Sequence, residues 1–139
     1  MVSTALKSQI QEDFQFLLEN KEVLGIFLYG SYAEEEATPH SDIDICVITR
    51  KKQKQFLTSL LNQIWGNVPV KTKQYDVRLF QELPLFIQGQ VIESGILILS
   101  NDPPEVYEIL YPYRREWEDQ KNRNQLSEDE IAEIFTDKL

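Results

Sequence analysis

Two aspartates, Asp42 and Asp44, stand at the start of an apolar segment of the sequence. Residues two apart on a strand project from the same face, so both carboxylates would point the same way. Carboxylate oxygens are the ligands that Mg²⁺ prefers, and two such ions about 4 Å apart can clamp a triphosphate during an in-line displacement. An isolated Asp-x-Asp pair is also typical of a solvated strand end, so other residues must decide between these interpretations.

The dipeptide Gly30-Ser31 precedes this pair, with ten residues between Ser31 and Asp42. It ends an apolar segment, where glycine would permit close approach of the backbone. The serine hydroxyl and neighbouring N–H groups could bind phosphate oxygens. The same dipeptide also occurs in ordinary strand-to-helix turns.

A third carboxylate, Asp76, lies on a predicted strand over residues 70–80. Alternation places it on one polar face with Thr72, Gln74 and Arg78, and this face is expected to line a wet cleft. Asp76 could ligate a metal and help to deprotonate an incoming hydroxyl group. Arg78 could contact a phosphate or pair with a nearby acid.

The apolar periodicity predicts an α/β (α+β) fold, a small mixed sheet flanked by helices, in one domain over residues 1–139. The expected strands cover residues 23–29, 42–49, 70–80 and 96–100. The expected helices cover residues 4–19, a segment from a Thr49 cap to Gly66, residues 84–95 and a helical C-terminal segment, 103–139. Within that last segment, Pro112 is expected to kink or interrupt the helix, and Ser127 and Glu130 to form a capping box.

Residues 30–44 resemble the signature of the minimal nucleotidyltransferases, the MNT branch of the DNA polymerase β superfamily, in which Gly-Ser is followed ten residues later by Asp-x-Asp. The likeness extends to Tyr75-Asp76-Val77, Leu83-Pro84 and Glu93-Ser94-Gly95, and it covers roughly residues 1–105. The resemblance implies a polymerase β-like nucleotidyltransferase domain that binds ATP. It also implies Mg²⁺, as two ions, held by Asp42, Asp44 and Asp76, with Gly30 and Ser31 contacting phosphates.

Stand-alone proteins of this branch and size are commonly the antitoxin of a pair whose toxin is a HEPN-domain RNase. The resemblance therefore implies a protein adenylyltransferase (an AMPylator) that neutralises its toxin by transferring AMP from ATP to a tyrosine. One alternative is a catalytically idle antitoxin that blocks the toxin by binding alone. Another is a transferase that modifies a small hydroxyl compound, although no second domain is expected to enclose such an acceptor.

The sequence departs from the family pattern at Glu34 and Glu35, because many members carry Arg-Gly after the alanine of this turn. Acids beside a triphosphate would weaken ATP binding unless their side chains point to solvent.

The formal net charge of −9 disfavours autonomous binding of nucleic acid. It suits either an acidic partner of a basic protein or a protein that recruits divalent cations. No apolar run approaches the roughly 20 residues of a membrane span, and the N-terminus lacks an apolar signal core. The single cysteine, Cys46, lies in an apolar run, which is consistent with a buried reduced thiol. These features predict a cytoplasmic protein without membrane contact.

Overall fold

The computed structural model describes the backbone of residues 2–137 and the side chains of residues 2–124. It contains a four-stranded mixed sheet in the order β3-β2-β1-β4. β1 is antiparallel to both β2 and β4, whereas β2 and β3 are parallel. The strands are β1 (Val23–Tyr29), β2 (Ile43–Thr49), β3 (Tyr75–Leu79) and β4 (Ile96–Leu99).

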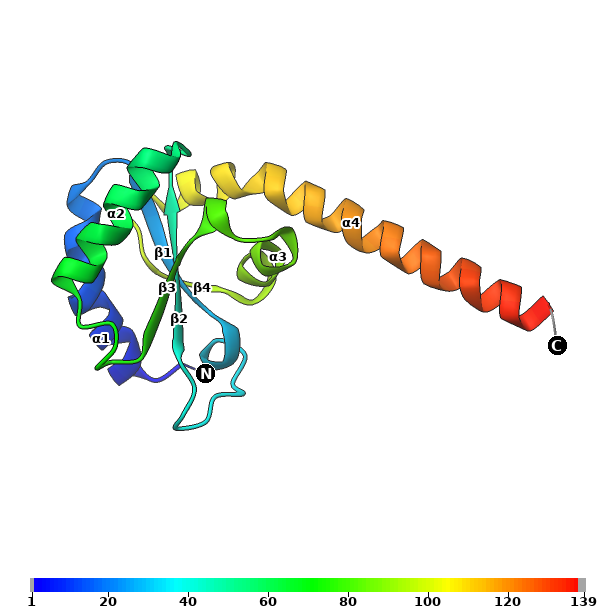
Figure 1. Ribbon diagram of the computed structural model, residues 1–139, viewed down its shortest axis with the longest axis horizontal. Coiled ribbons are helices and arrows are strands. Elements are labelled where there is room, and N and C mark those ends of the chain that lie inside the picture. The colour runs from blue at the N-terminus through cyan, green and yellow to red at the C-terminus, as the bar shows by residue number, and fades with distance from the viewer. Residues whose placement is uncertain (1, 138–139) are drawn as a thin grey trace.

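Helices cover both faces of this sheet (Figure 1). On one face lie α1 (Thr4–Phe14) and α2 (Lys54–Asn67), and on the other lie α3 (Leu85–Ser94) and α4 (Pro103–Asp137). α2 is the crossover that parallel strands such as β2 and β3 require. Within residues 2–137, three short 3₁₀ segments complete the fold: η1 (Gln15–Glu19), η2 (Gly30–Tyr32) and η3 (Phe80–Glu82). The predicted α/β fold, with a small mixed sheet flanked by helices, is confirmed.

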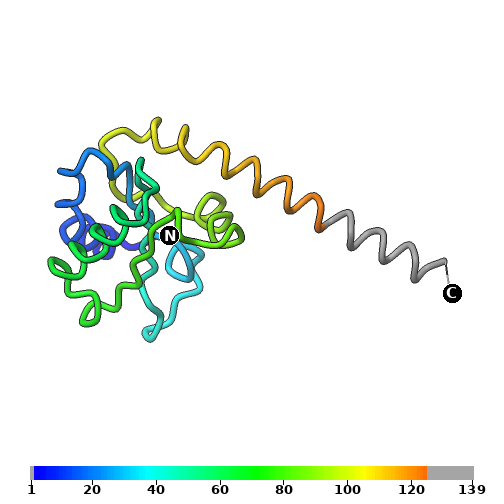
Figure 2. The backbone as a smooth tube through the Cα atoms, turned by 45° about the horizontal axis from the view of Figure 1, so that its top comes forward, coloured from blue at the N-terminus to red at the C-terminus, as the bar shows by residue number. Residues whose placement is uncertain are grey.

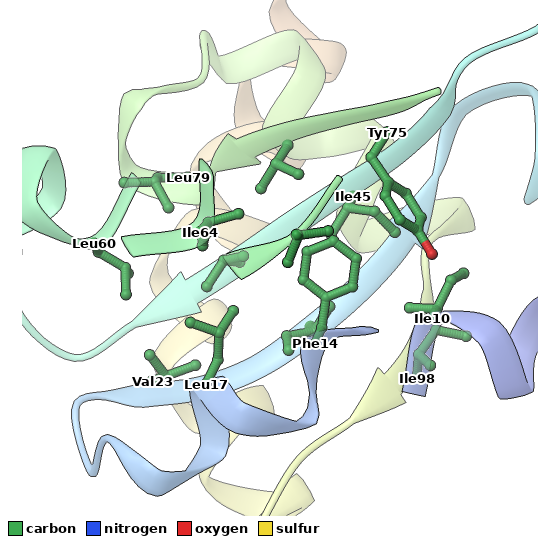
Figure 3. Packing of buried hydrophobic residues seen from close by; sticks show 14 of the residues in the cluster. Ile10, Phe14, Leu17, Val23, Ile45, Leu60, Ile64, Tyr75, Leu79 and Ile98 are labelled. Carbon is green, nitrogen blue, oxygen red and sulfur yellow. The ribbon is translucent and has the colours of Figure 1, made fainter. Parts of the chain in front are cut away.

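The sheet separates two apolar clusters, so β1 is buried along its whole length, as its continuous apolar run predicts. The cluster under α1 and α2 contains Phe14, whose ring meets that of Tyr75 edge-on at 4.9 Å between centroids (Figure 3). A hydrogen bond reinforces this packing of α1 against β3, because the Tyr75 hydroxyl donates to Asp13 Oδ2 at 2.5 Å. α1 therefore fixes the first residue of β3, directly before Asp76.

The strand predicted over residues 70–80 is shorter in the structure, where β3 begins at Tyr75. The backbone turns instead before this point: Gln74 has a φ of 59°, and the Tyr75 N–H donates to the Val70 carbonyl. The predicted Thr49 cap is also wrong. Thr49 is buried at the end of β2, where its hydroxyl donates to the Lys51 carbonyl.

α4 begins as predicted, since Asp102 Oδ1 accepts the N–H of Glu105 at 3.3 Å. The helix then continues through Pro112. Pro112 is exposed, so water can satisfy the carbonyl that loses its partner. The prediction of a new helix opening at Ser127 is wrong, because residue 127 lies inside α4; the side chains of the predicted capping box lie outside the described residues.

Contacts between α3 and α4 hold the first part of α4 against the body, and the helix then extends away from it (Figure 2). The Trp117 indole lies over Gly89 of α3, and its Nε1 donates to Glu93 Oε1 at 2.9 Å. Lys121 pairs with the same carboxylate. Within the described residues, no helix is both long enough and apolar enough to cross a membrane.

Candidate active site

Strand pairing brings two of the predicted acids together at one end of the sheet. Tyr29, the last residue of β1, is opposite Asp44 near the start of β2, and Asp44 is opposite Asp76 in β3. Residues paired in this way share a face of the sheet, which here is the face covered by α3. The alternation predicted for Asp76 and Arg78 is confirmed, whereas Thr72 and Gln74 lie in the preceding turn.

A cavity of about 380 Å³ opens over these side chains. The connection to α3 and the first turns of that helix form its other wall. The lining residues are Tyr29, Gly30, Asp44, Asp76, Arg78, Leu83, Pro84, Ile87 and Gln90. We call this the active-site cavity.

Gly30 is required by the geometry of this cavity. Its φ is +72°, a left-handed conformation that side chains with a Cβ disfavour. A Cβ built on Gly30 would also lie 2.1 Å from Asp44 Oδ2. The close approach predicted for this glycine therefore exists, and the group that it approaches is the Asp44 carboxylate.

The Asp44 carboxyl group is held in an unfavourable electrostatic environment. Burial, then the charges of Asp76 and Asp42, raise its pKa to about 6, against a smaller opposing effect of Arg78. The pKa of the neighbouring Tyr29 hydroxyl is also raised, chiefly by burial. A cluster of carboxylates that repel one another has the donor chemistry of a site for a divalent cation.

Arg78 pairs with Asp76 through a 2.9 Å contact between Nε and Oδ1. Both side chains are partly exposed, the arginine at 59% and the aspartate at 36%. Of the two roles considered for Arg78, the ion pair with an acid is the one that the structure contains.

Asp42 and Ser31 lie beside the active-site cavity and are absent from its lining. Asp42 is exposed, directly before β2, yet close enough for its charge to act on Asp44. Ser31 is half-buried in η2, and its carbonyl accepts the Glu36 N–H at 2.8 Å. Among the described residues, no three His, Cys, Asp or Glu side chains converge closely enough to hold a metal ion as they stand.

The two glutamates that depart from the family pattern also lie outside the lining of the active-site cavity. The Glu34 carboxylate accepts a hydrogen bond from Ser94 Oγ at the end of α3. Glu35 contributes to a separate hollow beside α1 and has a φ of +61°. Neither acid therefore adds its charge to the wall of the active-site cavity.

Sequence reasoning missed five lining residues: Tyr29, Leu83, Pro84, Ile87 and Gln90. Leu83 and Pro84 were predicted only as the start of a helix. Tyr29 could have been found, because it is the last strand residue before Gly30. The two residues of α3 carry no such signal, since their place in the site depends on how the helix packs on the sheet.

This fold and site define a nucleotidyltransferase. The family model "Polymerase beta, Nucleotidyltransferase" matches residues 11–104, and the chain belongs to that family. A protein of Methanocaldococcus jannaschii, named as a protein adenylyltransferase, is 38% identical over 103 residues, which are 73% of this chain and 75% of the relative.

Two solved structures extend the likeness to nearly the whole chain. One is a toxin–antitoxin complex with AMP-PNP, matched at a TM-score of 0.58 and 15% identity over 94% of this chain and 98% of that one. The other is a tri-AMPylated Shewanella oneidensis HEPN toxin in complex with an MNT antitoxin, matched at a TM-score of 0.56 and 15% identity over the same shares. At such identity these structures establish the shared fold.

Proposed function

We propose that this protein is an antitoxin that transfers AMP from ATP to a tyrosine of a HEPN-domain RNase toxin and thereby neutralises it. The observation that carries the proposal is the pairing of Asp44 with Asp76 beside the left-handed Gly30, in one cavity of a nucleotidyltransferase fold. The AMPylated toxin in the similar complex supports a HEPN toxin as the acceptor of the transferred group. The name of the M. jannaschii relative supports AMP as that group.

The reaction needs one bond to form and one to break. The tyrosine oxygen attacks the α-phosphorus of ATP, the bond from that phosphorus to the α,β-bridging oxygen breaks, and pyrophosphate leaves. Asp76 would accept the hydroxyl proton, and its position in the cavity lining and its partly exposed side chain support this role. The backbone beside Gly30 and the Ser31 hydroxyl would hold phosphate oxygens.

The carboxylates fit magnesium by their chemistry. Asp42, Asp44 and Asp76 would hold it, and their mutual repulsion, which helps to raise the pKa of Asp44, would be relieved by a cation. Bound magnesium would neutralise charge on the triphosphate and polarise a phosphoryl oxygen.

The test uses the toxin encoded by the neighbouring gene, incubated with this protein, Mg²⁺ and ATP labelled at either the α- or the γ-phosphate. Retention of the α label and loss of the γ label is the expected result, and replacing the acceptor tyrosine of the toxin with phenylalanine should abolish it. The double variant Asp42→Asn with Asp44→Asn should bind the toxin without labelling it. A complex that forms but never carries label would instead establish an idle, blocking antitoxin.

A further inference from the structure

A second cavity, also of about 380 Å³, lies next to the active-site cavity. It runs along β3, the edge strand of the sheet, between α2 and the connection that leads to α3. All five residues of β3 line it, and Leu61 and Trp65 of α2 form one wall. Because no further strand of residues 2–137 pairs with β3 on this side, a segment of another chain can enter from the edge of the sheet.

The two cavities meet at four residues that line both: Asp76, Arg78, Leu83 and Pro84. Gly30 and Asp44, which suit the triphosphate, line only the active-site cavity. A group transfer needs two substrates to converge on one reacting centre. The second cavity is therefore placed for a molecule that approaches Asp76 from the side opposite to the nucleotide.

The walls of this second cavity select for an aromatic group. Trp65 is 58% exposed although its indole is large and apolar, and Leu61 and Pro84 add apolar surface. A flat ring gains both buried area and a favourable aromatic pair on such a wall. The lining carries two acids, Asp76 and Glu82, and one cation, Arg78, which pairs with Asp76. Its net negative charge disfavours a carboxylate, whereas a carboxylate oxygen can accept a hydrogen bond from a hydroxyl group.

We infer that the second cavity is the acceptor site, and that it holds the tyrosine side chain of the partner with the ring against Trp65 and the hydroxyl beside Asp76. This inference rests on the proposed function and specifies where its second substrate binds. It assigns Trp65 to acceptor binding and leaves nucleotide binding to the other cavity.

The first test needs no partner protein. The chain has two tryptophans, Trp65 and Trp117, whose indole N–H groups give separate signals in nitrogen–proton correlation spectra. Titration with N-acetyl-tyrosinamide is expected to shift the signal of Trp65 and not that of Trp117, which lies over Gly89. The phenylalanine analogue should shift it less, and the serine analogue least. An unmoved Trp65 signal, or equal shifts of both tryptophans, would overturn the assignment.

The second test is kinetic and uses the labelled transfer to the toxin. Trp65→Ala is expected to raise the KM for the toxin about tenfold, as loss of an aromatic contact worth about 1.4 kcal/mol implies, with the KM for ATP unchanged. Trp65→Phe should restore most of the loss. Tyr107→Ala is the matched control, because Tyr107 is similarly exposed, at 51%, on α4.

An unchanged KM for the toxin in Trp65→Ala, or a raised KM for ATP, would contradict the acceptor site. Failure of the proposed function is a different outcome, because the wild-type protein would then transfer no label at all. In that case the shift of the Trp65 signal by the tyrosine analogue still decides whether the cavity binds a phenol.

Discussion

Replacing Asp44 with asparagine is expected to stabilise the protein at neutral pH when no divalent metal is present. Burial, Asp76 and Asp42 raise the pKa of the Asp44 carboxyl from 3.8 to about 6. A difference of about two pKa units corresponds to roughly 3 kcal/mol against the ionised form. Because the carboxyl group is partly exposed, solvent screening reduces this value, and we expect a gain of about 1–2 kcal/mol in the free energy of unfolding.

The pH dependence follows from the direction of this pKa change. Between about pH 4 and pH 6, the folded carboxyl keeps a proton that the unfolded chain has already lost, so the wild-type protein loses stability as the pH rises through this range. Asparagine does not titrate. The advantage of Asp44→Asn is therefore smallest below pH 4, grows up to about pH 6 and stays constant above it.

Urea denaturation in the presence of EDTA, repeated from pH 4 to pH 8, measures this difference directly. Asp119→Asn is a suitable control, because Asp119 is an exposed residue of α4 and does not line the active-site cavity. The reasoning would be refuted if Asp44→Asn were less stable than wild type at pH 7, or if its advantage did not change with pH.

Three further results are expected. Mg²⁺ at ten times its Kd should raise the free energy of unfolding of the wild-type protein by about 1.4 kcal/mol, and of Asp44→Asn by much less, as thermal melting would show. Gly30→Ala should lower stability by about 2 kcal/mol, because a methyl group there conflicts with both the positive φ and the Asp44 carboxylate. It should also slow labelled transfer by about 100-fold, since misplacement of a reacting group by about 1 Å has that effect. Glu35→Gly should raise the free energy of unfolding by about 0.5–1 kcal/mol, because glycine adopts the left-handed φ of this position without strain. Glu36→Gly, in the same turn, should lower the free energy of unfolding. Urea denaturation of both variants separates local strain from a general effect of glycine.

The sequence predicts the strands well where burial dictates residue type. β1 is apolar throughout because both of its faces are covered, and its predicted bounds are those of the structure. The prediction was too long for β3, where Lys71 to Gln74 turn before the strand begins at Tyr75. The alternation of polar and apolar residues continues through the turn, so it does not show that the positive φ of Gln74 separates the turn from the strand.

The candidate site was predictable to the extent that it depends on strands. Asp44 and Asp76 meet because of strand alternation and pairing, which a sequence pattern can express. Gln90 lines the active-site cavity and Trp65 lines the second cavity because helices pack on the sheet at particular positions. No local sequence pattern encodes that packing. The pairing of Arg78 with Asp76 was one of two alternatives that only the three-dimensional arrangement could separate.

The parallel register of β2 and β3 restricts where this chain can change in length during evolution. One residue inserted into either strand would turn Asp44 or Asp76 to the opposite face, into the apolar layer beneath α1 and α2. The segments 50–53 and 70–74 lie outside the strands and outside the spacing from Gly30 to Asp44, so they can lengthen or shorten without moving either carboxylate. Related proteins that meet different partners are therefore expected to differ in length in these connections, while the spacing within β2 and β3 stays constant.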